Sequence, residues 1–278
     1  MLSATLTNSI PTEDDRGAYA LLLNPKGRVQ TDLRVLKCAR GVLVDTEPEG
    51  ADAARETLGR YAPFSRVRLE DLSGTWSILG LYGPHAHELL EGPDLAEHGT
   101  TELGIGDENL LVAGVSAPVA GHDLIGPSEA VAHAREHLAS RGAVPVNPDA
   151  YETVRVEAGV PRFGADLTPE NFPGEVDGVL ERAVDFAKGC YPGQETVARM
   201  RYRGHPNKTL YRISAASDDL TAGTTILQEG KPVGTVTSVA PISSGGETFA
   251  LCYLSRRTNL DRPLTAREAE VRVLGVAG

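Results

Sequence analysis

The residue pattern of the sequence changes at Asn207, and this change is the strongest constraint on the fold. From Leu210 onward the chain consists of short pieces rich in β-branched and aromatic residues, separated by glycine-rich turns. This pattern is typical of a small β-barrel or sandwich of about 70 residues. Before Asn207, strand and helix patterns are mixed without strict alternation, which favours an α+β arrangement. We therefore expect an α+β body followed by a separate β domain.

Within the α+β part, turn and cap signals divide the chain into elements. Asn24-Pro25-Lys26-Gly27 is a strong turn signal between two strand-like runs, which predicts a hairpin. The remaining expected elements are a strand at 42–44, a helix at 49–61, strand-like alternation over 67–83, a helix from Pro84, a helix from Ser128 to Gly142 with Ala130, Val131, Ala134 and Leu138 as its apolar stripe, and a strand at 151–160.

Charge and hydropathy exclude several classes of protein. The net charge of −11 and the pI near 5.1 argue against broad nucleic-acid binding. No apolar run approaches the roughly 20 residues of a membrane span. The first residues lack a cationic start followed by an apolar stretch, so a secretion signal is not expected. A cytoplasmic protein is the default expectation.

The three cysteines form neither a disulfide framework nor a CxxC pair. Cys38 and Cys252 lie in strand-like apolar runs and are expected in the core. Cys190 differs, because it stands in the segment KGCYPGQE between Lys188 and a Tyr-Pro-Gly turn. Glycines and nearby cations favour a reactive thiolate. The alternative is that Cys190 is a small buried apolar residue.

The segment after this cysteine is predicted to be a cationic helix. Glu195 and Arg199 have i,i+4 spacing, and Val197 and Met200 supply a narrow apolar face. In residues 188–212 the only acid is Glu195. The same window contains six cations: Lys188, Arg199, Arg201, Arg203, Lys208 and Arg212. This excess indicates a site for a carboxylate, a phosphate or an acidic partner surface, unless the face is merely solvated.

Other polar residues have two interpretations each. Asp32 follows the first hairpin and either faces a ligand pocket or is an ordinary exposed acid. If 151–160 is a strand, Arg155 and Glu157 share a face, as an ion pair or as ligand contacts. His133 and His137 have metal-ligand spacing, but no third ligand is evident, so we expect a solvated helix edge and no metal site.

The segment KGCYPGQE, followed by VAR and RG, resembles the signature of the YgfZ family of folate-binding proteins, which are relatives of the glycine cleavage T-protein (an aminomethyltransferase). Weaker similarity extends to 24–35, 79–90 and 151–167. The resemblance implies a ring of two α+β units and a C-terminal barrel. We assign 1–48 with 145–207 to the first unit, 49–144 to the second and 208–278 to the barrel.

The resemblance also implies a function. It predicts an accessory protein that binds tetrahydrofolate or a one-carbon derivative and supports iron–sulfur cluster assembly or repair, with iron–sulfur enzymes or assembly proteins as partners. In this prediction Cys190 is the reactive thiol, assisted by Lys188. The residues that orient its loop are Gly189, Tyr191, Gly193, Gln194, Glu195 and Arg199. The predicted folate contacts are Asp32, Tyr151, Arg155 and Glu157.

Two other functions stay open. An aminomethyltransferase would pass a methylene group from an aminomethyl-lipoyl carrier to tetrahydrofolate. Against it, the T-protein has two adjacent aspartates where this chain has Thr31 and Asp32, and the segment 118–123 lacks the T-protein's pterin-gripping pattern. A structural adaptor would instead use the cationic segment to bind an acidic partner and no small molecule.

Overall fold

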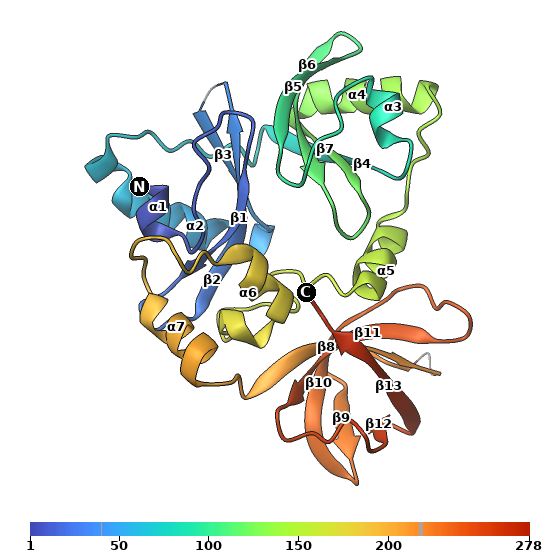
Figure 1. Cartoon of the computed structure of the whole chain (residues 1–278). Coiled ribbons are helices and arrows are strands. Elements are labelled where there is room, and N and C mark those ends of the chain that lie inside the picture. Colours follow the sequence, from blue (N-terminus) through green and yellow to red (C-terminus); the bar gives the residue numbers. More distant parts are fainter. Residues whose placement is uncertain (40, 217–218) are drawn as a thin grey trace.

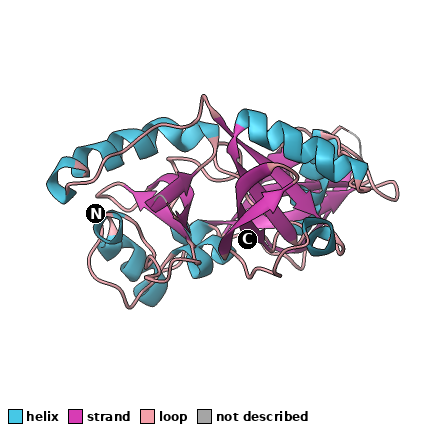
Figure 2. Ribbon diagram, turned by 90° about the horizontal axis from the view of Figure 1, so that it is seen from above, coloured by secondary structure: helices cyan, strands magenta, loops and turns pink. Residues whose placement is uncertain are grey.

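The computed structural model describes residues 1–39, 41–216 and 219–278. Two α+β parts and a β-barrel follow one another around the centre of the molecule (Figure 1). Viewed from above, the strands occupy the middle of the molecule and helices lie on both outer sides (Figure 2). Within the described residues, none of the helices combines the length and the apolarity needed to cross a bilayer.

The first sheet has the order β1-β2-β3 and is antiparallel, with β1 at Ala18–Leu23, β2 at Val29–Cys38 and β3 at Gly41–Asp45. The Asn24 side chain accepts hydrogen bonds from the amides of Lys26 and Arg28, which closes the predicted hairpin. This hairpin and the third strand are confirmed. Cys38, predicted in the core, is only half-buried at the end of β2.

Helices cover the first sheet. They are α1 (Leu2–Thr5), α2 (Pro48–Tyr61), α6 (Asp177–Ala183) and α7 (Gln194–Arg203), with short 3-10 turns η1 (Pro63–Ser65) and η2 (Pro173–Glu175). α2 packs on β2, and α6 packs on β1. The helix predicted at 49–61 is therefore confirmed, and so is a helix after Cys190, which begins at Gln194 inside the KGCYPGQE segment.

The second sheet has the order β4-β7-β6-β5, with β4 at Trp76–Tyr82, β5 at Thr100–Ile105, β6 at Glu108–Val115 and β7 at Gly121–Pro127. Helix α4 (Ser128–Ser140) buries the predicted stripe of Ala130, Val131, Ala134 and Leu138. Two details were wrong. The run 67–72 is not a strand, and the Ser128 side chain bonds the carbonyl of Thr75 instead of capping α4. The short helix α3 (Ala86–Leu90) begins two residues after Pro84.

The strand predicted at 151–160 was wrong, because these residues form helix α5 (Pro148–Ala158). Asn147 caps its first turn through a hydrogen bond from the amide of Asp149, and Pro148 occupies a first-turn position. Gly159 ends the helix in the left-handed region, with φ of 79°. Arg155 and Glu157 therefore do not share a face in the way that a strand would require.

The C-terminal part is a closed barrel with strand order β10-β11-β8-β13-β12-β9, which confirms the predicted small β-barrel. The strands are β8 (Lys208–Ala215), β9 (Thr225–Gln228), β10 (Lys231–Val239), β11 (Thr248–Ser255), β12 (Leu264–Ala266) and β13 (Ala269–Val276). Closure leaves the barrel without a free sheet edge. Cys252 lies in its core, where burial raises the thiol pKa to about 12.

Candidate functional site

One face of the first sheet is polar and looks toward the centre of the molecule. Residues along β2 alternate between buried and half-buried, and Asp32 and Arg34 belong to the half-buried set. The Tyr19 hydroxyl, from β1, donates a hydrogen bond of 2.7 Å to Asp32. Arg34 pairs with Asp45 of β3 at 2.5 Å. The sheet thus presents two carboxylates, one guanidinium and one phenol on a single face.

The second sheet completes this polar space from the other side. Asp123, on β7, binds the guanidinium of Arg34 at 2.6 Å and accepts a 2.7 Å hydrogen bond from the Tyr82 hydroxyl. The Tyr82 ring stacks on Tyr151 of α5, with centroids 5.6 Å apart. Three strands (β2, β4 and β7) and helix α5, from distant parts of the chain, therefore meet around one ion pair.

Burial changes the proton affinity of the groups in this space. Desolvation raises the pKa of Asp32, and the hydrogen bond from Tyr19 offsets part of that rise. Desolvation also raises the pKa of Glu47, which the negative charge of Asp32 raises further. Tyr19 has a pKa well above its usual value because of burial and the neighbouring Asp32. Carboxyl groups in such a setting are poised for proton exchange or for binding N–H donors.

An aromatic and cationic wall adjoins Asp32. Tyr19 stacks on His98 with centroids 6.4 Å apart, and the guanidinium of Arg182 lies 5.6 Å from the Tyr19 ring centre. Burial lowers the pKa of His98, and the positive charge of Arg34 acts in the same direction. His98 is thus favoured as a neutral imidazole. The stacked rings of Tyr19 and His98 therefore lie beside the carboxylate oxygens of Asp32, which can accept hydrogen bonds.

The KGCYPGQE segment lies next to the first hairpin, and most of its side chains hold the loop. The Tyr191 ring is buried in the core, and the Lys188 ammonium stands 5.2 Å from its centre. That ammonium donates hydrogen bonds to the carbonyls of Ser3 and Leu6, at 2.8 and 2.5 Å. Lys188 therefore anchors the N-terminal segment, which does not favour its predicted role beside the thiolate. Cys190 itself is exposed.

The backbone at position 193 requires a glycine. It adopts a φ of 82°, and a side chain there would approach the carbonyl oxygen of Asn24 and the Cα of Gly27 to 2.7 Å. Gln194 accepts a hydrogen bond from the amide of Tyr191 at 3.2 Å, which fixes the turn. Gly189, by contrast, is exposed and has open space around its Cα. The loop is thus locked to the hairpin from one side of Cys190.

The predicted cationic cluster is divided among separate partners. Arg201 pairs with Glu181 at 2.5 Å, Lys208 lies 3.8 Å from Glu175, and Arg212 donates to the carbonyl of Glu157. The predicted pair of Glu195 and Arg199 is not among the ion pairs of the described residues. Arg199 and Arg203 are exposed on α7 without an ion pair in the described part of the chain. The six cations therefore do not form one extensive anion-binding face.

Arg155, predicted as a folate contact, is a buried structural residue. Its side chain is 4% exposed and binds Glu152 at 2.7 Å, Asp166 at 2.9 Å and the hydroxyl of Ser238 at 2.9 Å. These bonds tie α5 to β10 of the barrel, so the guanidinium has no donors to spare for a ligand. Glu157 lies half-buried further along α5. Of the four predicted contacts, only Asp32 and Tyr151 reach the central polar space.

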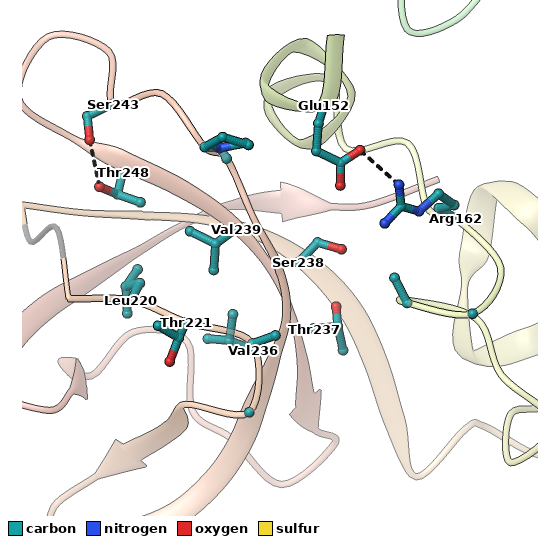
Figure 3. Close-up of a pocket in the computed structure, with 16 residues that line it drawn as sticks. Glu152, Arg162, Leu220, Thr221, Val236, Thr237, Ser238, Val239, Ser243 and Thr248 are labelled. Atoms are coloured by element: carbon teal, nitrogen blue, oxygen red, sulfur yellow. Dashed lines mark hydrogen bonds and ion pairs between the residues drawn. The ribbon is translucent and has the colours of Figure 1, made fainter. Parts of the chain in front are cut away.

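A cavity of about 1130 Å³ opens between the barrel and α5 (Figure 3). Its charged lining residues are Glu152 and Arg162, 3.4 Å apart, and most of the rest is the wall of β10 with the loops beside it. Arg162 also acts on the centre of the molecule, because its positive charge lowers the pKa of Glu47.

Sequence reasoning missed most of the central site. The residues that it did not single out are Tyr19, Arg34, Glu47, Tyr82, His98, Asp123 and Arg182. Arg34 and Tyr82 lie inside the similar segments 24–35 and 79–90, and Asp123 ends the segment 118–123, but none of the three was singled out as a residue. The alternation along β2 was the one signal that could have suggested Arg34. His133 hydrogen-bonds Glu108 at 2.8 Å. Within the described residues, no group of three or more His, Cys, Asp and Glu side chains is arranged to hold a metal ion.

Comparison with known proteins places this geometry in context. A family model for the GCVT N-terminal domain matches residues 1–188, and one for the C-terminal β-barrel domain of CAF17 matches residues 207–275. A tRNA-modifying protein YgfZ of Yersinia pestis (strain Pestoides F) is 27% identical over 262 residues, covering 90% of this chain and 77% of that protein. A putative chloroplastic transferase of Arabidopsis thaliana is 25% identical over 264 residues, covering 91% of this chain.

This chain spans only 60% of the length of that plant relative. Among solved structures, the glycine cleavage system aminomethyltransferase T from Bartonella henselae superimposes with a TM-score of 0.77 at 19% identity. The superposition covers 100% of this chain and 79% of the other. The likeness establishes a T-protein-like fold, as the sequence predicted.

Proposed function

Because the chain belongs to the family of the GCVT N-terminal domain, we propose that it binds tetrahydrofolate, or a one-carbon derivative, in the central polar space. The observation that carries this proposal is the half-buried Asp32, held by Tyr19 between the two sheets. A partly desolvated carboxyl group there would bind N–H groups of a reduced pterin. The stacked rings of Tyr82 and Tyr151 would flank a flat ligand.

Anaerobic calorimetry with tetrahydrofolate tests this proposal. The wild-type protein should bind with saturation, and Asp32→Asn should weaken binding on the order of tenfold, since a charge-assisted hydrogen bond is lost. Asp52→Asn is the matched control, because Asp52 is an exposed acid on α2 paired with Arg55. If the wild-type protein shows no saturable binding, the folate proposal fails.

We further propose that Cys190 serves an accessory role in iron–sulfur cluster assembly or repair. Its exposed thiol stands in a loop whose neighbouring side chains are engaged in packing and hydrogen bonds. The relatives named as tRNA-modifying proteins suggest that the supported iron–sulfur enzyme acts in tRNA modification. In a strain lacking this protein, Cys190→Ala should fail to restore that enzyme's activity, whereas Cys38→Ala should restore it. Full complementation by Cys190→Ala would remove the thiol from the mechanism.

A second candidate function is aminomethyl transfer, favoured by the superposition of the whole chain on an aminomethyltransferase. Thr31 stands where the T-protein resemblance implies a second aspartate, and its hydroxyl contacts that of Thr46 at 2.7 Å. The discriminating assay is release of ammonia from an aminomethylated lipoyl carrier in the presence of tetrahydrofolate. Folate binding without ammonia release would favour the accessory role.

A further inference from the structure

Arg162 has unused hydrogen-bond donors at the cavity between the barrel and α5. Together with Glu152 it supplies the charged lining of this cavity of about 1130 Å³. In the described part of the chain, its side chain makes one bond, a long contact of 3.4 Å to Glu152, and is 43% exposed. A guanidinium carries several N–H donors, so most of those on Arg162 are available to a ligand.

Glu152, the partner of Arg162, is already satisfied by another cation. Arg155 binds both carboxylate oxygens of Glu152, through Nε at 2.8 Å and through Nη2 at 2.7 Å. This bidentate pair is buried on the side of Arg155, and it is much shorter than the contact that Arg162 makes. An anion that binds Arg162 in place of Glu152 therefore leaves the Glu152 carboxylate with a cation.

The backbone of Arg162 is held in position by Asp166, which is fully buried. The amide of Arg162 donates a 3.1 Å hydrogen bond to the Asp166 carboxylate. In return, the amides of Asp166 and Leu167 donate to the carbonyl oxygen of Arg162, at 2.9 and 3.2 Å. Asp166 is itself bound by Arg155 at 2.9 Å. The half-exposed guanidinium thus extends from a fixed loop, which lowers the cost of ordering it around a ligand.

The other wall of the cavity combines hydroxyl groups with short apolar side chains (Figure 3). Ser238, on β10, is 5% exposed; its hydroxyl accepts a bond from Arg155 and donates none within the described residues. The hydroxyls of Ser243 and Thr248 lie 3.1 Å apart. The apolar lining residues are Leu220, Val236, Val239, Ala240 and Pro241. Such a lining suits a neutral, partly apolar ligand body.

We infer that this cavity binds a small carboxylate, with Arg162 as the group that takes the charge. The charges of Arg155, Arg162, Glu152 and Asp166 sum to zero, so a carboxylate adds a single negative charge to the set. A phosphate group would bring nearly twice that charge beside Glu152 and is disfavoured. Asp32 is not among the residues that line the cavity, so the inference goes beyond the proposed function and does not depend on it.

Hexanoate is the test ligand, because it carries one carboxylate on a neutral apolar chain and contains no pterin. Titration of the nitrogen-15-labelled protein, followed by NMR, should give saturable shifts at residues 220–223 and 236–241. Arg162→Met should weaken binding about tenfold, since a charge-assisted hydrogen bond is lost. Arg60→Met is the matched control, because Arg60 is an exposed cation of α2 paired with Glu56, and it should bind as the wild type does.

Glu152→Gln should change the affinity in the opposite direction. It removes the acid that competes for Arg162 and repels the ligand, so hexanoate should bind several-fold more tightly. Arg155 keeps its bond to Asp166 in this variant. The inference fails if hexanoate does not saturate, if the shifts lie away from the cavity, or if Arg162→Met binds as tightly as the wild type. Weaker binding by Glu152→Gln would also overturn it.

Tetrahydrofolate then identifies the source of the natural carboxylate. Displacement of hexanoate by tetrahydrofolate would assign the cavity to the glutamate tail of a folate, and simultaneous binding would assign it to a separate acid. Both results support a carboxylate site. Failure of tetrahydrofolate to bind at all would refute the proposed function and leave the hexanoate result unchanged.

Discussion

At the scale of single residues, Arg155 shows how a polar residue suspected of ligand binding can have a structural task. On α5 it reaches Glu152 on its own helix, Asp166 in the following loop and Ser238 on the barrel. Its guanidinium also donates to the carbonyl oxygen of Val160 at 2.5 Å. Asp166 is fully buried and accepts a further hydrogen bond from the hydroxyl of Thr237. The planar, multidentate donor set of arginine suits such a hub.

Arg155→Ala should lower the free energy of unfolding by about 3–5 kcal/mol, because the buried carboxylate of Asp166 loses its cation. The measurement is urea denaturation followed by circular dichroism. The matched control is Arg162→Ala: Arg162 shares the partner Glu152, but at 3.4 Å and with a side chain 43% exposed. That variant should lose about 1 kcal/mol or less. Equal losses in the two variants would contradict the structural role of Arg155.

A functional residue could be predicted only where a motif or turn in the neighbouring sequence marks it. Cys190 and Asp32 stood out because a motif or a hairpin marks them in the sequence. Glu47 and Tyr19 carry no local mark, and Asp123 was met only as the end of the segment 118–123, since the roles of all three arise only when separate elements meet. The role of Lys188 was missed for the same reason, because its partners Ser3 and Leu6 lie at the other end of the family-matched segment.

At the scale of elements, the hairpin, the helix stripe of α4 and the barrel strands were predictable from periodicity and turns. Helix α5 was not, although Asn147-Pro148 and Gly159 are ordinary start and stop signals for a helix. Apparent alternation over 151–160 outweighed them. The buried positions Thr153, Arg155 and Val156 include two polar residues, which blurred the helical apolar stripe.

His122 and Asp123 are adjacent on strand β7, and the buried His122 makes the stability of the protein depend on pH. Asp123 joins the central ion pair, while His122 is 3% exposed and neither of its ring nitrogens has a hydrogen-bond partner among the described residues. Burial lowers the pKa of His122, although the negative charge of Asp94 opposes that effect. Above its unfolded pKa of about 6.5 the neutral ring is tolerated. As pH falls below that value the unfolded chain binds the proton more readily, so stability declines.

Replacement of His122 by leucine should therefore flatten part of the pH dependence of stability. The free energy of unfolding of the wild-type protein should fall relative to His122→Leu as pH decreases from about 7 to 5. His122→Asn, which is polar but does not titrate there, should follow the leucine variant in slope. Urea titrations at several pH values measure this. Parallel curves for the wild type and both variants would contradict the prediction.

At the scale of the whole molecule, Arg34 couples the two α+β parts. It binds Asp45 of its own sheet and Asp123 of the other, and all three side chains are at most 22% exposed. The resemblance to the T-protein anticipated the general layout and the superposition supports it, but this inter-sheet contact was not predictable. It joins residues 89 positions apart, and no sequence pattern encodes their meeting.

Arg34→Met should destabilise the protein by roughly 2–4 kcal/mol, because two partly buried carboxylates lose their shared cation. Hydrogen exchange should increase at the facing strands β2 and β7. The control is Arg262→Gln, which removes an exposed pair with Glu229 and should change stability by about 1 kcal/mol at most. If exchange increases in β2 alone, Arg34 acts within its sheet and does not couple the parts.

The close approach of Gly193 to Gly27 limits how far the cysteine signature can be separated from the rest of the chain. A synthetic peptide of residues 188–204 would contain every letter of the motif but none of the backbone that shapes it. The Asn24–Gly27 turn and the carbonyls of Ser3 and Leu6 would be missing. The thiol's environment is therefore a property of the assembled fold, and the motif cannot be transplanted into another scaffold as a short cassette.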